Sequence, residues 1–159
     1  FVKDNDYANY VKRHSNTSIK EGNFVDTKGN VLGRHKGIVN YTIGQRKGLG
    51  IAFGKPMFVI DINAKNNTVI LGDNSDLFQY NLIAKDVNFI SIEDIKEPIR
   101  VKAKVRYAAK PADATVYKVA EDKIKIVFDE AQRAITKGQS VVMYDGDKVV
   151  GGGIIESSF

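Results

Sequence analysis

Six short segments of strand-forming residues, each bounded by turn signals, occupy the second half of the chain. They lie within about eighty residues and are rich in Val, Ile, Phe, Tyr and Ala. Such a run of short strands is typical of a small antiparallel barrel. The sequence therefore predicts a six-stranded antiparallel β-barrel. The expected strands are Leu82–Ile90, Ile99–Tyr107, Ala114–Val119, Lys123–Phe128, Ser140–Tyr144 and Val149–Ile155.

Glycines mark two features near the end of this run. Asp145-Gly146 is a dipeptide that favours a tight hairpin turn between two strands. Gly151, Gly152 and Gly153 lie inside the last expected strand, where glycine indicates a bulge or a close approach of another backbone. We therefore expect an irregular last strand.

The first half contains two further strand pairs. A hairpin is expected over 23–33, with its turn at Lys28-Gly29-Asn30. A second pair is expected over Pro56–Ile62 and Thr68–Leu71. The turn-forming residues Gly72–Ser75 then interrupt the pattern, and this predicts a module boundary near 76–81.

The residues before the first hairpin have a different pattern. Asn5 or Asp6 can cap a short helix whose apolar face carries Tyr7, Tyr10 and Val11. The predicted fold class is mainly β. The predicted layout is a short helix and linker over 1–20, a small β-rich central domain over 21–78 and a C-terminal β-barrel domain over 79–159.

Composition excludes several kinds of function. The chain of 159 residues has no cysteine, so these residues contain no disulfide, no thiolate metal site and no catalytic thiol. His14 and His35 lie far apart, without nearby metal-ligand types, so no metal site is predicted. No apolar run is long enough to span a membrane. The net charge of +5 is compatible with binding to nucleic acid.

A glycine-rich stretch over 37–50 contains the neighbouring cations Arg46 and Lys47. Glycine permits positive φ and lets another backbone approach closely, and two cations in such a loop suit an anion such as phosphate. The spacing matches neither the P-loop nor the dinucleotide fingerprint. A tight connector with solvated cations is the alternative.

Cations alternate with apolar residues over 99–107. On a strand, Ile99, Val101, Ala103 and Val105 would face a core, and the intervening side chains would face outward. Such a row can follow a phosphate backbone, and a solvated barrel face is the alternative. Tyr107 ends the expected strand, where it can stack on a base or pack as a core aromatic at the rim. The outward row consists of Arg100, Lys102, Lys104 and Arg106.

Three segments resemble the tRNA-specific 2-thiouridylase family, in the family's order: "YTIGQRKGLG", "KVRYAAKP" and "FDEAQRAITKGQSVVMYDGDKVVGGGIIE". The resemblance implies that Arg106, Tyr107 and Gln139 contact tRNA, and we add Arg46, Lys47 and Lys104 as expected contacts. The family usually has proline where this chain has Lys137, a change that should loosen the turn before Gln139.

The resemblance also implies where the chemistry lies. Family members bind ATP, with magnesium, in an N-terminal domain that carries an "SGGxDS" loop. They adenylate the wobble uridine and transfer sulfur from a cysteine persulfide that a sulfur-relay protein supplies. This chain has neither that loop nor a cysteine, so we expect a C-terminal part of a cytoplasmic enzyme, without a cofactor site and inactive alone.

Two other functions remain open at this point. The chain can be a stand-alone β-barrel module that binds RNA or resembles a translation factor. It can also be a protein-interaction barrel with no role in nucleic-acid binding. Binding to tRNA that depends on salt concentration would separate the last function from the other two.

Overall fold

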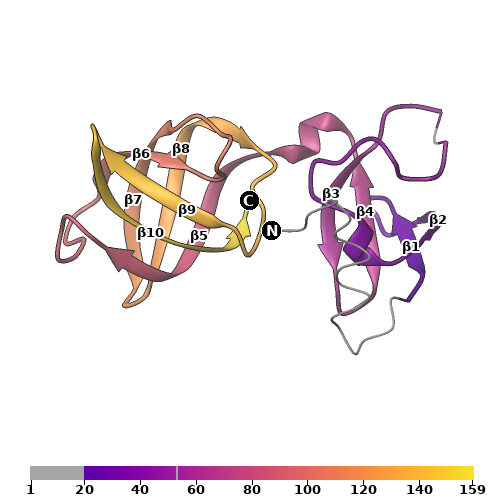
Figure 1. Ribbon diagram of the computed structural model, residues 1–159, viewed down its shortest axis with the longest axis horizontal. Coiled ribbons are helices and arrows are strands. Elements are labelled where there is room, and N and C mark those ends of the chain that lie inside the picture. Colours follow the sequence, from indigo (N-terminus) through magenta and orange to yellow (C-terminus); the bar gives the residue numbers. More distant parts are fainter. Residues whose placement is uncertain (1–19, 53) are drawn as a thin grey trace, which may run out of the picture. The chain divides into compact units, whose positions relative to one another are not determined.

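The computed structural model describes residues 20–52 and 54–159, and the helix expected around Tyr7 lies outside these residues. The chain divides into two compact units, with the division between Asp76 and Leu77 (Figure 1). Both units are built from β-strands, and the helical elements described are two short 3-10 turns, η1 (Ile38–Asn40) and η2 (Asn74–Leu77). The mainly-β fold class is therefore confirmed.

The first unit contains a four-stranded sheet in the order β2-β1-β4-β3. The expected hairpin is present, and the Asp26 carboxylate stabilises its turn by accepting hydrogen bonds from the backbone N–H groups of Lys28 and Asn30. A parallel pairing of β1 with β4 joins the two hairpins, and the sequence pattern had not predicted it. The strands are β1 (Gly22–Val25), β2 (Val31–His35), β3 (Phe58–Asn63) and β4 (Thr68–Gly72).

An aromatic cluster of Phe24, His35 and Tyr41 lies in the core of this unit. His35 is 1% exposed, and its ring meets those of Phe24 and Tyr41 edge to face. Its Nδ1 accepts a hydrogen bond from the N–H of Gly37 (3.0 Å), so the neutral ring carries its proton on Nε2 and donates to the carbonyl of Asn67 (3.1 Å). Burial lowers the pKa of His35, which keeps the ring in this neutral form.

The second unit is a closed barrel in the strand order β10-β5-β8-β7-β6-β9, with every neighbouring pair antiparallel. All six strands expected from the sequence are present, so the predicted barrel is confirmed (Figure 1). The strands are β5 (Phe78–Phe89), β6 (Ile99–Lys104), β7 (Ala112–Ala120), β8 (Lys123–Arg133), β9 (Ser140–Asp145) and β10 (Lys148–Ser158).

Several strand ends differ from the expected ones, and three of the larger differences concern β5, β6 and β8. β5 begins four residues before Leu82, and β8 extends five residues beyond Phe128, because Phe78 pairs with Arg133 across the two strands. β6 ends at Lys104 rather than at Tyr107, because the chain then enters a turn. Alternate residues of all six strands fill the barrel. Among the most buried are Leu82, Val116, Ile124, Ile126, Val141, Met143 and Ile155.

The glycines of β10 form the predicted irregular strand. The pairing register shifts between Val149 and Gly151 against β9, and between Gly152 and Ile154 against β5. A Cβ atom added to Gly151 would lie 2.4 Å from the carbonyl oxygen of Asn88. Glycine at this position therefore allows the close backbone approach that closes the barrel.

Candidate nucleic-acid interface

One end of the barrel brings together the barrel residues that the family resemblance singled out. β6 ends at this end and β7 begins there, joined by the loop over 105–111. β8 also ends there and β9 begins there, joined by the segment over 134–139. Antiparallel pairing fixes both connections at the same end. Arg106 and Tyr107 are therefore on the first connection and Gln139 is on the second.

The alternation along β6 is confirmed. Val101, Ala103 and Val105 are buried, whereas Arg100 and Lys102 are exposed on the outer face. This outer face is not a uniform row of cations, because carboxylates from β7 and from β8, the strand beyond it, pair with its first two members.

Arg100 forms a two-pronged ion pair with Asp129 on β8, with N–O distances of 2.8 and 2.6 Å. Lys102 pairs with Asp113, its cross-strand neighbour on β7, at 2.9 Å. Hydrogen bonding to Arg100 lowers the pKa of Asp129, and the same bond raises the pKa of Arg100. Because each of these two cations faces a carboxylate, this part of β6 presents little net positive charge to a phosphate.

Tyr107 is the most exposed aromatic side chain of the described residues, at 97%. It lies in a turn that is closed by a hydrogen bond from the N–H of Ala109 to the carbonyl of Arg106 (3.1 Å). The interpretation as a core aromatic at the rim is therefore wrong, since the turn carries the ring into solvent. The ammonium of Lys104 lies 5.3 Å from the centre of the Tyr107 ring, so an aromatic surface and a cation are presented together.

Gln139 closes a tight turn that begins at Thr136. Its N–H donates to the carbonyl of Thr136 (3.2 Å), and Gly138 has φ +84°, which matches the third position of a type II turn. Two backbone hydrogen bonds to Ile155, both 2.8 Å, fasten the turn to β10. The Gln139 side chain is exposed, so a firmly held backbone presents a free amide group.

The guanidinium of Arg106 points toward the end of β8. Its Nη2 donates a hydrogen bond to the backbone carbonyl of Arg133 and a longer one, 3.5 Å, to that of Ala134. Arg106 therefore links the loop over 105–111 to the segment that leads to Gln139.

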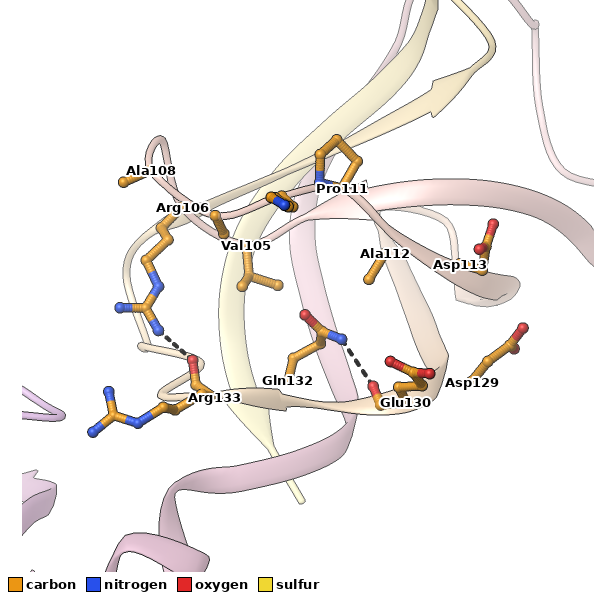
Figure 2. A pocket seen from close by; sticks show the side chains of 12 residues that line it. Val105, Arg106, Ala108, Pro111, Ala112, Asp113, Asp129, Glu130, Gln132 and Arg133 are labelled. Carbon is orange, nitrogen blue, oxygen red and sulfur yellow. Dashed lines mark hydrogen bonds between the residues drawn. The ribbon is translucent and has the colours of Figure 1, made fainter.

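A cleft of about 640 Å³ lies between the loop over 105–111 and the end of β8. Figure 2 shows Arg106 and Arg133 at one side of the cleft and Asp113, Asp129 and Glu130 at the other. The two arginines of the cleft therefore lie at the side where the connection to Gln139 begins, and Lys110 adds a further cation from the loop over 105–111. Val105, Ala108, Ala109, Pro111 and Ala112 contribute apolar lining.

Arg46 and Lys47 belong to the first unit. Both side chains are exposed, in a loop where Gly44, Gly48 and Gly50 all have positive φ. Gln45 stabilises the loop, since its side chain accepts a hydrogen bond from the N–H of Thr42 and donates to the carbonyl of Lys47. The loop thus holds two outward cations on a defined backbone.

The sequence analysis did not predict that Asp113, Asp129, Glu130 and Arg133 line this cleft. The partner of Lys102 could have been found from the hairpin register, since a two-stranded pairing of β6 with β7 places Asp113 directly opposite. The positions of the other three residues depend on the extension of β8 to Arg133. The sequence pattern had ended this strand at Phe128.

Among the described residues, no group of three or more His, Cys, Asp or Glu side chains is arranged to hold a metal ion. The same residues contain no helix that is long and apolar enough to cross a membrane.

Two family models match the chain. Residues 8–73 match the tRNA methyl transferase PRC-barrel domain, and residues 79–155 match the aminomethyltransferase beta-barrel domain.

The chain is also similar to curated proteins of one kind. It is 77% identical over 158 residues to the tRNA-specific 2-thiouridylase MnmA of Clostridioides difficile (strain 630), covering 99% of this chain and 44% of that protein. It is 60% identical over 156 residues to the tRNA-specific 2-thiouridylase MnmA of Acetivibrio thermocellus, and 57% identical to MnmA 1 of Clostridium botulinum (strain Okra / Type B1). These two alignments each cover 98% of this chain and 44% of the relative, so the chain spans less than half the length of these relatives.

Proposed function

We propose that this chain, which belongs to the tRNA-specific 2-thiouridylase family, binds and positions tRNA through one end of its barrel. The observation that carries the proposal is the display of Tyr107 and Gln139 on two connections at that end, next to a cleft that Arg106, Lys110 and Arg133 line. Unpaired tRNA bases suit such a surface, because single-stranded RNA is recognised by stacking on aromatic rings and by hydrogen bonds to base edges.

Tyr107 and Lys104 form the stacking part of this interface in our proposal. The phenol ring is 97% exposed, and stacking a base on it removes apolar surface of both partners from water. The Lys104 ammonium, 5.3 Å from the ring centre, adds attraction for the adjoining phosphate.

Gln139 supplies a donor and an acceptor. An amide group can bond to a base edge or to a ribose hydroxyl in either orientation. Because its backbone is fastened to β10 through Ile155, little ordering of the chain is needed when the amide binds.

Arg46 and Lys47 form a second contact, made by the first unit, in our proposal. Their exposure and their fixed loop backbone suit contacts with phosphate groups. Such contacts position an RNA without reading its sequence.

The proposed reaction of the whole enzyme is the transfer of sulfur to C2 of the wobble uridine in tRNA, in the cytoplasm. ATP would activate the uridine, and a cysteine persulfide supplied by a sulfur-relay protein would deliver sulfur. The 159 residues contain no cysteine and no "SGGxDS" loop, so they do not fit an ATP site and no step of this chemistry is assigned to them. Their proposed contribution is to orient the substrate.

The test has two parts. Purified 1–159 should bind unmodified tRNA, with an affinity that falls as salt concentration rises. The same chain, supplied with ATP, magnesium and a persulfide donor, should form no 2-thiouridine, and fusion to the ATP-binding domain of a relative should restore thiolation. Failure to bind tRNA would leave the protein-interaction function as the better explanation, and thiolation by 1–159 alone would refute the assignment of chemistry to another domain.

A further inference from the structure

We propose that Arg106 acts in tRNA binding as a positioning residue, which holds the Tyr107 turn and the Gln139 turn together, and not as a phosphate contact. This inference rests on the proposed function for its role in tRNA binding. The contacts from which it is drawn are within the protein.

The segment after β8 needs such a support. Ala134 has φ +55°, a left-handed conformation that is unfavourable for a residue with a Cβ atom. Its N–H bonds to the carbonyl of Leu77 (2.7 Å), whereas the carbonyls of Arg133 and Ala134 turn toward the guanidinium of Arg106. The Ala134 carbonyl also accepts a hydrogen bond from the Thr136 hydroxyl (3.1 Å), whereas Arg106 provides a charged donor to the carbonyl of the half-buried Arg133.

Arg106 also stabilises the turn that carries Tyr107. The backbone carbonyl of Arg106 accepts the hydrogen bond from Ala109 that closes the turn carrying Tyr107. Its side chain meanwhile holds the residues immediately before the Thr136–Gln139 turn. One residue therefore fixes the separation of the two groups that we propose to contact RNA, and Figure 2 shows its side chain reaching across to the Arg133 backbone.

The direction of the guanidinium argues against a phosphate contact. Nη2 already faces two carbonyl oxygens, and the side chain is half-buried. Turning it outward would remove this donor from the Arg133 carbonyl, while the Ala134 carbonyl would keep its hydrogen bond from Thr136. Arginine suits the positioning role because one planar group offers several donors in a fixed geometry, whereas lysine keeps the charge but offers a single ammonium.

The substitutions R106K and R106A separate the two roles. If Arg106 positions the turns, both variants weaken tRNA binding to a similar extent, within about threefold of each other, and the slope of log K against log salt stays at the wild-type value, because no phosphate contact is lost. If Arg106 contacts phosphate, R106K keeps most of the affinity, and R106A lowers the slope by about 0.7–0.9. Lys148, exposed at the other end of the barrel, provides the matched control K148A, which should change neither affinity nor slope.

Amide hydrogen exchange without tRNA tests the positioning itself. In both Arg106 variants, the amides of Ala134, Gly138 and Gln139 should exchange about tenfold faster or more, because the segment loses a charge-assisted hydrogen bond. Unchanged exchange in both variants, or full binding by R106K, would overturn the inference. Methyl signals of Val116 and Val141 verify that each variant keeps its barrel. If wild-type protein fails to bind tRNA, the proposed function fails, while the exchange data still decide whether Arg106 holds the two turns.

Discussion

Replacing His35 by phenylalanine tests whether a buried imidazole organises the first unit. Phenylalanine keeps an aromatic ring against Phe24 and Tyr41 but can neither accept from Gly37 nor donate to Asn67. Leaving the buried Gly37 N–H unpaired costs about 1–3 kcal/mol, and losing the bond to the half-buried Asn67 carbonyl costs about 0.5–1.5 kcal/mol. H35F should therefore lower the free energy of unfolding of the first unit by about 1.5–4.5 kcal/mol.

The loss of unfolding free energy caused by H35F should depend on pH in a defined direction. Burial lowers the pKa of His35 below 6.5, so as pH falls the unfolded chain takes up this proton before the folded chain does. The wild-type free energy of unfolding then decreases as pH drops below 6.5 toward the folded pKa, by at most about 1.4 kcal/mol per pH unit for one proton. Phenylalanine does not titrate, so the difference between wild type and H35F should shrink as pH falls through this window.

Urea unfolding followed by methyl NMR can resolve the two units. Val59 and Val69 report on the first unit, and Val116 and Val141 report on the barrel. Y41F is the matched control, because it keeps the aromatic cluster and removes only a 3.4 Å hydrogen bond from Lys36. An H35F variant as stable as Y41F, or a difference from wild type that grows as pH falls below 6.5, would refute the reasoning.

Three further predictions concern the barrel. G151A should lower the free energy of unfolding of the barrel by about 1–3 kcal/mol, because the new Cβ would lie 2.4 Å from the Asn88 carbonyl; urea unfolding would measure this, and wild-type stability would contradict the close packing. K137P should raise the stability by about 0.4–1 kcal/mol, because Lys137 occupies the second position of a type II turn; a lower melting temperature would contradict that turn assignment. Y107A should weaken tRNA binding about 5- to 150-fold with an unchanged salt slope, because the lost contact is uncharged stacking; titrations of tRNA at several salt concentrations would reveal a changed slope if this is wrong.

The sequence predicted the barrel well because its strands are local features. Alternation or β-branched residues indicate each strand, and turn dipeptides such as Asp145-Gly146 join consecutive strands. The parallel pairing of β1 with β4 was not predictable in this way, since more than forty residues separate Val25 from Thr68. No local pattern specifies which strands of distant hairpins will pair.

The candidate site shows the same division between local and distant information. The outward direction of Lys104 followed from strand alternation, and the exposure of a turn residue such as Tyr107 is a local property once the end of β6 is known. The partners of Arg100 and Arg106 lie 29 and 27 residues away in sequence. Alternation within β6 could not reveal these contacts, which pair Arg100 with a carboxylate and join Arg106 to a backbone carbonyl.

These pairings change the electrostatic character of β6 from one end to the other. Arg100 and Lys102, near its start, are matched by carboxylates on β8 and on the neighbouring β7, respectively. Among the ion pairs of the described residues, none involves Lys104 or Arg106, so positive charge that no carboxylate neutralises lies at the end where Tyr107 and Gln139 are displayed. An RNA approaching the outer face would be attracted to that end rather than along the whole strand, because the carboxylate of each ion pair largely cancels the field of its cation. In our proposal, the carboxylates of Asp113 and Asp129 would thereby direct binding toward the barrel end without contacting the RNA themselves. The substitution D129N should remove the carboxylate that pairs with Arg100, so that Arg100 can contact an additional phosphate. Chemical footprinting of bound tRNA would then show extra protected phosphates. An unchanged footprint would mean that Arg100 lies beyond the reach of the RNA.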